Sequence, residues 1–148
     1  MSLPRNPWLI AAGALSAAAA VLHLAIIAGG PDWYRFFGAG EGMARMAERG
    51  MLRPTLIALG IASVLAIWAA YAFAGAGLIR RLPLMRTALV SITCVYLLRG
   101  LVLGPLLIVR PEAVDAFALW SSLIVLAYGI AYAVGTRRAW PALSAGAR

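Results

Sequence analysis

Residues 54–79 read PTLIALGIASVLAIWAAYAFAGAGLI, and this stretch contains no charged side chain. An α-helix needs about 20 consecutive apolar residues to cross the hydrocarbon core of a bilayer, which is roughly 30 Å thick. The stretch is long enough, and it lacks the alternation of apolar and polar residues that marks a membrane β-strand. It therefore predicts a transmembrane helix.

Three further apolar runs lie at residues 8–29, 84–109 and 116–136. Charged residues make up 12% of the chain and hydrophobic residues 64%, whereas soluble domains carry about 25% charged residues. The sequence predicts an all-α membrane protein in which four transmembrane helices form one domain over residues 1–148. The first run begins like a secretory signal, but it continues to Ala28, so we interpret it as a retained helix.

Arginine placement predicts the orientation in the membrane. All thirteen basic residues are arginine, and with five acidic residues the net charge is +8. If the four helices alternate in direction, one side holds arginines and no acid: Arg5, Arg80, Arg81, Arg86, Arg137, Arg138 and Arg148. The positive-inside rule places this side, with both termini, in the cytoplasm. The composition, rich in Arg, Ala and Gly, favours a bacterial inner membrane. A soluble basic protein would suggest a nucleic-acid partner, but here the arginines lie at the ends of apolar helices, so we expect none.

The first connection, residues 29–54, is too long for a simple turn. Residues 39–50 have helical periodicity, with Met43 and Met46 on one face and Arg45 and Glu48 mostly on the other. Glu41 and Arg45 stand four residues apart with the acid first, which is the favourable order. We expect a short amphipathic helix at the outer membrane surface.

Small residues predict close packing of the helices. Ala62, Ala66, Ala70 and Ala74 recur every four residues, and Gly129 and Ala133 repeat that spacing in the fourth run. Such residues let helix backbones approach each other. We therefore expect a compact bundle.

Arg99 stands in the middle of CVYLLRGLVLGP, residues 94–105. Gly104–Pro105 should bend or end this helix, because proline removes a backbone donor. Arg99 would then lie about 8–15 Å below the outer surface. In one interpretation it extends toward the surface as a structural residue. In the other it faces the bundle interior and binds an anion or a proton-carrying partner, because charge inside a membrane is by default a sign of function.

Other polar residues occur at a similar depth to Arg99. His23 precedes the outer end of the first helix, Tyr96 lies one turn from Arg99, and Ser121 and Ser122 lie in the outer part of the fourth helix. With Glu41 above them, we predict a polar pocket bordered by Arg99, His23, Tyr96 and Glu41. Each has a simpler explanation: His23 and Tyr96 as bundle contacts, and Glu41 as the solvated partner of Arg45.

The stretch YRFFGAGEGMARMAERG (34–50), with His23 before it and YLLRG (96–100) after it, resembles uncharacterised small bacterial four-helix inner-membrane proteins. The general build is also similar to that of the DoxX-like proteins, without a specific shared motif. The resemblance covers about residues 20–136. It implies the four-helix membrane architecture and no reaction.

Three functions fit this sequence. The first is binding of an anionic or amphipathic small molecule or lipid at the polar pocket. The second is an accessory or scaffold subunit of a larger membrane complex, and the third is a small transporter or channel acting as a homo-oligomer. The sequence shows no nucleophile–base pair, metal-ligand cluster or phosphate-binding loop, so it identifies no cofactor, no metal site and no catalytic residue, and it leaves open whether the protein is an enzyme.

Overall fold

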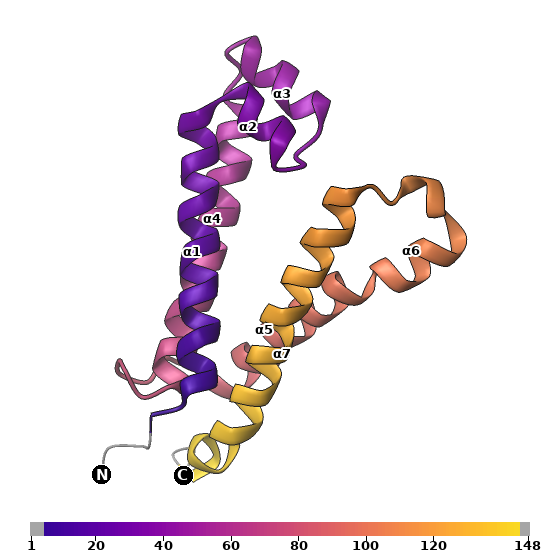
Figure 1. Cartoon of the computed structure of the whole chain (residues 1–148). Helices are drawn as coiled ribbons and strands as arrows, with labels where there is room; N and C mark the ends of the chain where they lie inside the picture. The colour runs from indigo at the N-terminus through magenta and orange to yellow at the C-terminus, as the bar shows by residue number, and fades with distance from the viewer. Residues whose placement is uncertain (1–4, 146–148) are drawn as a thin grey trace. The chain divides into compact units, whose positions relative to one another are not determined.

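A computed structural model describes residues 5–145 of the chain, and all regular structure in that range is helical (Figure 1). The long helices are α1 (Pro7–Gly29), α4 (Arg53–Gly75), α5 (Met85–Leu101) and α7 (Ala116–Ala145). The short ones are α2 (Pro31–Phe36), α3 (Glu41–Glu48), α6 (Leu103–Val109) and the 3₁₀ turn η1 (Pro111–Ala113).

Four helical segments are long and apolar enough to cross a membrane, as the sequence predicted. They are α1, α4, the α5–α6 segment Met85–Val109, and α7, with mean hydropathies of 2.2, 2.2, 2.1 and 1.8. α5 ends at Leu101 and α6 begins at Leu103. The helix is therefore interrupted at Val102, about one turn before Pro105, which has no N–H to donate to a carbonyl of the preceding turn.

Two helix ends differ from the sequence-based bounds. α4 ends at Gly75 rather than at residue 79, because Gly77 has a positive φ of 75° and Leu78 N donates to Phe73 O at 3.0 Å, which closes the helix end. α7 continues beyond residue 136 to Ala145, with Pro141 inside it. The apolar run stops at the arginines Arg137 and Arg138, but the helix itself does not.

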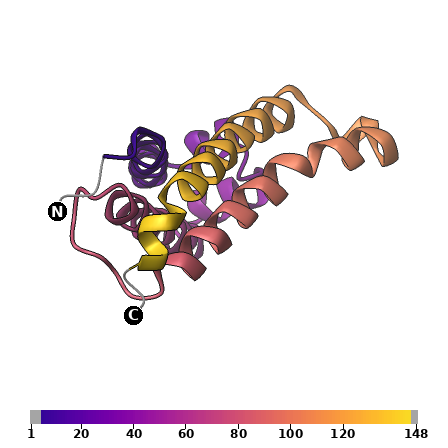
Figure 2. The ribbon, with the colours of Figure 1, turned by 90° about the horizontal axis from the view of Figure 1, so that it is seen from below.

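The chain forms two compact units. Unit 1 comprises the residues up to Leu15 and those from Trp68 onward, and unit 2 comprises Ser16–Ile67. In unit 1, α5 and α7 lie side by side over most of their length (Figures 1 and 2). In unit 2, α2 and α3 pack together, as the purple ribbons that carry these labels in Figure 1 show.

The core of unit 1 is built around small residues. Leu9 is fully buried, and a Cβ added to Gly75 or Gly135 would come within 2.9 or 2.7 Å of its side chain. A Cβ on Gly13 would lie 2.6 Å from the ring of Phe73. Glycine at these positions lets α1, α4 and α7 approach closely, as expected for membrane helices.

The predicted alanine stripe on α4 is only partly correct. Ala62 and Ala74 are buried, but Ala66 is exposed. The buried face instead follows alternating steps of four and three residues: Ala58, Ala62, Leu65, Ala69, Ala72 and Ala76. A strict four-residue step advances about 400° per repeat at 3.6 residues per turn, so it drifts around the helix and leaves the contact face.

The beginning of α1 and the end of α7 meet in unit 1. Asn6 Nδ2 donates a hydrogen bond to Gly135 O at 2.7 Å, and the guanidinium of Arg81 donates to Ala142 O. These contacts gather one end of α1, the connection after α4 and the last turns of α7. The arginines predicted to face the cytoplasm therefore lie at one end of unit 1, apart from Arg148, which is outside the described residues.

The core of unit 2 joins α2 and α3 to the adjoining parts of α1 and α4. Ile26, Tyr34, Ala44 and Ala58 are buried together. Residues 39–50 were predicted to form one short helix, and α3 occupies most of that range. α2 was not predicted, because Pro31–Phe36 is too short to show periodicity.

Candidate functional site

Arg99 lies on the last turn of α5 and contacts α7. Its Nη1 donates a hydrogen bond to Oγ of Ser122 at 3.2 Å. Ser122 is only 3% exposed, whereas Arg99 is exposed. The serine hydroxyl is thus fixed in the contact between α5 and α7, and it holds one edge of an otherwise accessible guanidinium.

Close helix packing positions this pair. A Cβ on Gly100, the neighbour of Arg99, would come 2.7 Å from Cα of Leu126, and a Cβ on Gly129 would come 2.7 Å from the side chain of Leu97. The predicted role of Gly129 in close packing is confirmed. These contacts bring the two backbones together beside Arg99, so the short side chain of Ser122 can reach its guanidinium.

No carboxylate neutralises Arg99 within residues 5–145. The four ion pairs of this range all lie between residues 32 and 48. Arginine has five N–H donors in a planar fork and stays charged in proteins. Most of these donors are therefore left for a ligand, lipid or water.

Tyr96 belongs to an aromatic cluster rather than to an open pocket wall. Its side chain is 5% exposed, and its ring centroid lies 5.0 Å from Trp68, 5.5 Å from Tyr128 and 5.3 Å from Tyr132. Tyr132 Oη donates to Trp68 O at 3.0 Å. The sequence did not predict this cluster, because its members come from three different helices, α4, α5 and α7.

His23 lies in unit 2 and is half-buried on α1. Its Nδ1 is 2.8 Å from Ala19 O, four residues earlier. A carbonyl oxygen can only accept, so Nδ1 carries the proton in this contact and Nε2 has the free lone pair when the ring is neutral. His23 therefore keeps one nitrogen that can accept a hydrogen bond.

Glu41 is also in unit 2, where Arg35 and Arg45 hold it. Arg35 Nε donates to Glu41 Oε2 at 2.8 Å, and Arg45 Nε donates to Oε1 at 3.0 Å. These hydrogen bonds, Arg35 first, lower the pKa of Glu41 from 4.5 to about 2. The expected Glu41–Arg45 pair is confirmed, but the stronger partner is Arg35.

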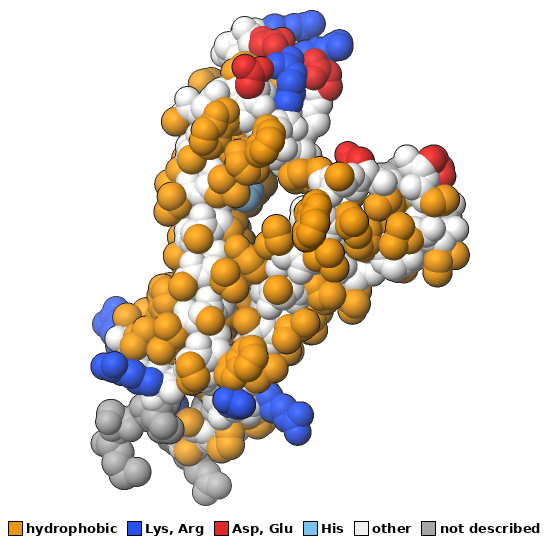
Figure 3. All heavy atoms as spheres, viewed as in Figure 1, with side chains coloured by type: hydrophobic (Ala, Val, Ile, Leu, Met, Phe, Trp, Pro, Cys, Tyr) orange, Lys and Arg blue, Asp and Glu red, His pale blue; other side chains and the backbone are white. Residues whose placement is uncertain are grey.

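Arg35 is the centre of a larger ion cluster over α2 and α3. It also contacts Asp32 at 3.2 Å and Glu48 at 2.6 Å. Figure 3 shows these red and blue side chains gathered on the α2–α3 part of unit 2. Of these pairs, only Glu41–Arg45 was predicted from the sequence. Arg35 and Glu48 are thirteen residues apart and meet through the turn between α2 and α3.

Of the four predicted site residues, Arg99 and Tyr96 lie in unit 1, and His23 and Glu41 lie in unit 2. The pocket predicted to be shared by all four stays a prediction.

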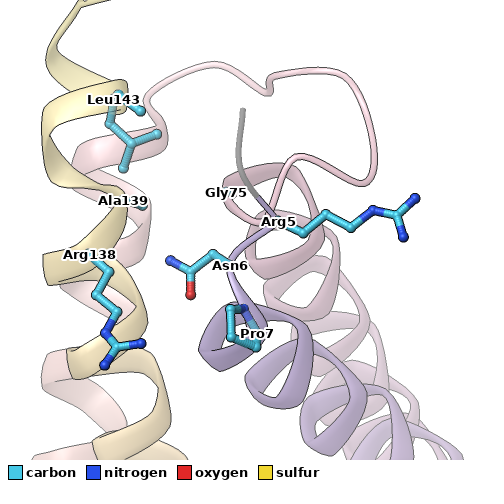
Figure 4. A pocket seen from close by; sticks show the side chains of 8 residues that line it. Arg5, Asn6, Pro7, Gly75, Arg138, Ala139 and Leu143 are labelled. Carbon is cyan, nitrogen blue, oxygen red and sulfur yellow. The ribbon is translucent and has the colours of Figure 1, made fainter. Parts of the chain in front are cut away.

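Unit 1 also has a small cavity of about 210 Å³ at its arginine-rich end, lined by Asn6, Gly75, Arg138 and Leu143 among others. Figure 4 shows that the side chain of Arg5, which also lines it, extends away from α7 and from Arg138. The two guanidinium groups therefore do not converge on one ligand position in this cavity.

Comparison of the chain with protein-family models, with curated proteins and with solved structures finds no match.

Proposed function

We propose that this chain is a multi-pass protein of the bacterial inner membrane that binds an anionic or amphipathic small molecule or lipid at Arg99. The observation that supports this function best is the environment of Arg99. It is a permanent cation inside the α5–α6 segment, which is long and apolar enough to cross a membrane. Within residues 5–145 it has a serine partner and no carboxylate.

An uncompensated arginine near the middle of a membrane costs about 2.5–3.5 kcal/mol on insertion scales. The hydrogen bond to Ser122 offsets only part of this cost, because a neutral hydroxyl carries no opposite charge. A bound carboxylate or phosphate would neutralise the guanidinium and accept two parallel N–H bonds from its planar fork. The close contact of Gly100 with α7 holds Arg99 in place for such a ligand.

The remaining predicted residues enter this proposal in different ways. Tyr96 supports α5 from within the aromatic cluster, one turn before Arg99. His23 lies in unit 2, where its Nε2 is free to accept a hydrogen bond. Glu41 is committed to two arginines, and its low pKa makes it a weak base at neutral pH.

The test is native mass spectrometry of the gently extracted protein. We expect the wild type to retain a small molecule or lipid, and Arg99→Ala to lose it. Arg110→Ala is the matched control, because Arg110 is an exposed arginine just after α6 with no ion pair in the described range. Removing a membrane charge should leave the thermal stability equal or higher, so loss of ligand would not reflect unfolding.

Retention of the same molecule by Arg99→Ala would contradict the proposal. A stoichiometric protein that copurifies with both the wild type and Arg99→Ala, without any small ligand, would instead indicate the accessory-subunit role.

A further inference from the structure

A second candidate binding region lies on the opposite stretch of the α5–α7 pair, away from Arg99. An open groove of about 540 Å³ runs between the two helices, and Cys94, Ala133, Thr136, Arg137 and Trp140 are among its lining residues. We call it the α5–α7 groove. Its lining is largely apolar, and the positively charged side chain of Arg137 lies at one end.

Two arginines supply charge at that end. Arg137 lines the groove itself. Arg86 lies with its guanidinium carbon 4.2 Å from the ring centroid of Trp140, which also lines the groove. Stacking on an indole uses the face of a guanidinium, whereas its N–H donors lie in the plane. Arg86 therefore keeps donors available for an anion beside Trp140.

No negative charge competes for these arginines in the described part of the chain. All five acidic residues fall within residues 32–48 and 112–115, and none lies on α5 or α7 near the groove. A negatively charged group would therefore match the charge of the groove end that holds Arg137 and Arg86. An apolar chain would match the rest of the groove lining.

One buried polar group in the groove also has no partner. Thr136 is 6% exposed, and its Oγ1 forms no hydrogen bond with any described residue. A buried hydroxyl left unsatisfied carries a desolvation cost. Oγ1 itself is inaccessible to an occupant of the groove, so the apolar lining and the charges of Arg137 and Arg86 are what support a ligand here.

We propose that the α5–α7 groove binds an anionic phospholipid, with one acyl chain along Ala133 and Cys94 and the phosphate at Arg137 and Arg86. Trp140 would lie at headgroup depth, where tryptophan is enriched in membrane proteins. Basic pockets between membrane helices on the cytoplasmic side bind anionic headgroups in this way. The site is separate from Arg99, and it does not depend on the function proposed there.

The first test measures lipid binding by native mass spectrometry, with phosphatidylglycerol and phosphatidylcholine added to the full chain. We expect selective retention of phosphatidylglycerol. Arg137→Gln should weaken its affinity about fivefold, the equivalent of roughly 1 kcal/mol for one juxtamembrane arginine. Arg80→Gln, an exposed arginine in the connection after α4, is the matched control and should bind like the wild type.

Ala133→Leu fills the groove without changing the charge and should also reduce phosphatidylglycerol binding. If that variant folds poorly, a second measurement replaces it. Phosphatidylglycerol with brominated acyl chains should quench tryptophan fluorescence in the wild type, and quench it less in Trp140→Phe. Brominated phosphatidylcholine at the same fraction should quench the two proteins equally.

Wild-type affinity in Arg137→Gln would overturn the proposal, as would equal binding of the two lipids. Displacement of phosphatidylglycerol by inorganic phosphate would show a site for free anions rather than for a lipid. Arg99→Ala should keep its phosphatidylglycerol. The result for Arg137→Gln therefore tests the groove proposal, and the result for Arg99→Ala tests the proposed function, so either can fail without the other.

Discussion

At the scale of single residues, glycines differ in how closely other atoms approach them. Where an added Cβ would clash with a neighbouring helix, glycine is needed for helix packing, and elsewhere it is not. Gly100 lies against the backbone of Leu126, whereas a Cβ on Gly104 meets no heavy atom within 4 Å. The two glycines are four residues apart, and both lie in the α5–α6 segment. They form a matched pair for testing the contact that positions Arg99.

We expect Gly100→Ala to destabilise the protein by about 1–3 kcal/mol, the usual cost of overpacking a close contact. The clash involves backbone atoms of α7, which cannot move aside as a flexible side chain can. Gly104→Ala should have little effect or stabilise slightly, because alanine favours helix. Thermal unfolding in detergent would measure both variants, and equal melting temperatures would contradict the packing argument.

At the scale of elements, α2 and α3 are held by both a core and an ion cluster. The core contributes Tyr34 and Ala44, which are 3% and 0% exposed. Arg35 links Glu41 and Glu48 of α3 to α2. Because these side chains are partly exposed, the ion pairs should add modestly to a hydrophobic contact and lose strength in salt.

The pKa of Glu41 gives this cluster a pH dependence. Its pKa falls from 4.5 to about 2 on folding, so the stabilisation is fully present above pH 4.5 and is lost as the pH falls toward 2. We expect the resonances of α2 and α3 to shift in NMR spectra over that window. Glu41→Gln should remove this transition, while Glu112→Gln should leave it unchanged. A transition that persists in Glu41→Gln would assign it to another carboxyl group.

At the scale of the whole molecule, contacts within unit 1 bring the beginning of α1 to the end of α7. Asn6 bonds to Gly135, and Arg138 lies 5.7 Å from the ring of Trp8. Both ends of the described chain therefore lie at the same end of this unit. An even number of membrane crossings requires the same arrangement.

We propose that this end faces the cytoplasm. A green fluorescent protein fused after Arg148 should fluoresce, and alkaline phosphatase fused there should be inactive, because that enzyme matures only in the periplasm. Alkaline phosphatase inserted at Gly40, in the turn between α2 and α3, should be active. Activity at the C-terminus and none at Gly40 would reverse the orientation.

The sequence was sufficient to predict the helical content, the four apolar segments and the interruption of the third segment near Pro105. These depend on composition and on local backbone chemistry, which a single segment contains. The sequence also marked Arg99 as a candidate site residue. A charged residue within an apolar run can be recognised without knowing which residues it contacts. The sequence did not predict all of the helix ends. α7 continues past Arg137 and Arg138 to Ala145, because a helix can extend beyond its apolar segment.

Only the tertiary structure decided which residues meet. Ser122 as the partner of Arg99, the aromatic cluster around Tyr96 and the joining of Arg35 to Glu48 each combine residues from different helices. The buried face of α4 also departs from the simple alanine repeat. Contacts of this kind depend on how helices cross and rotate against each other. That geometry is set by close packing of many small side chains, and no single segment of sequence contains it.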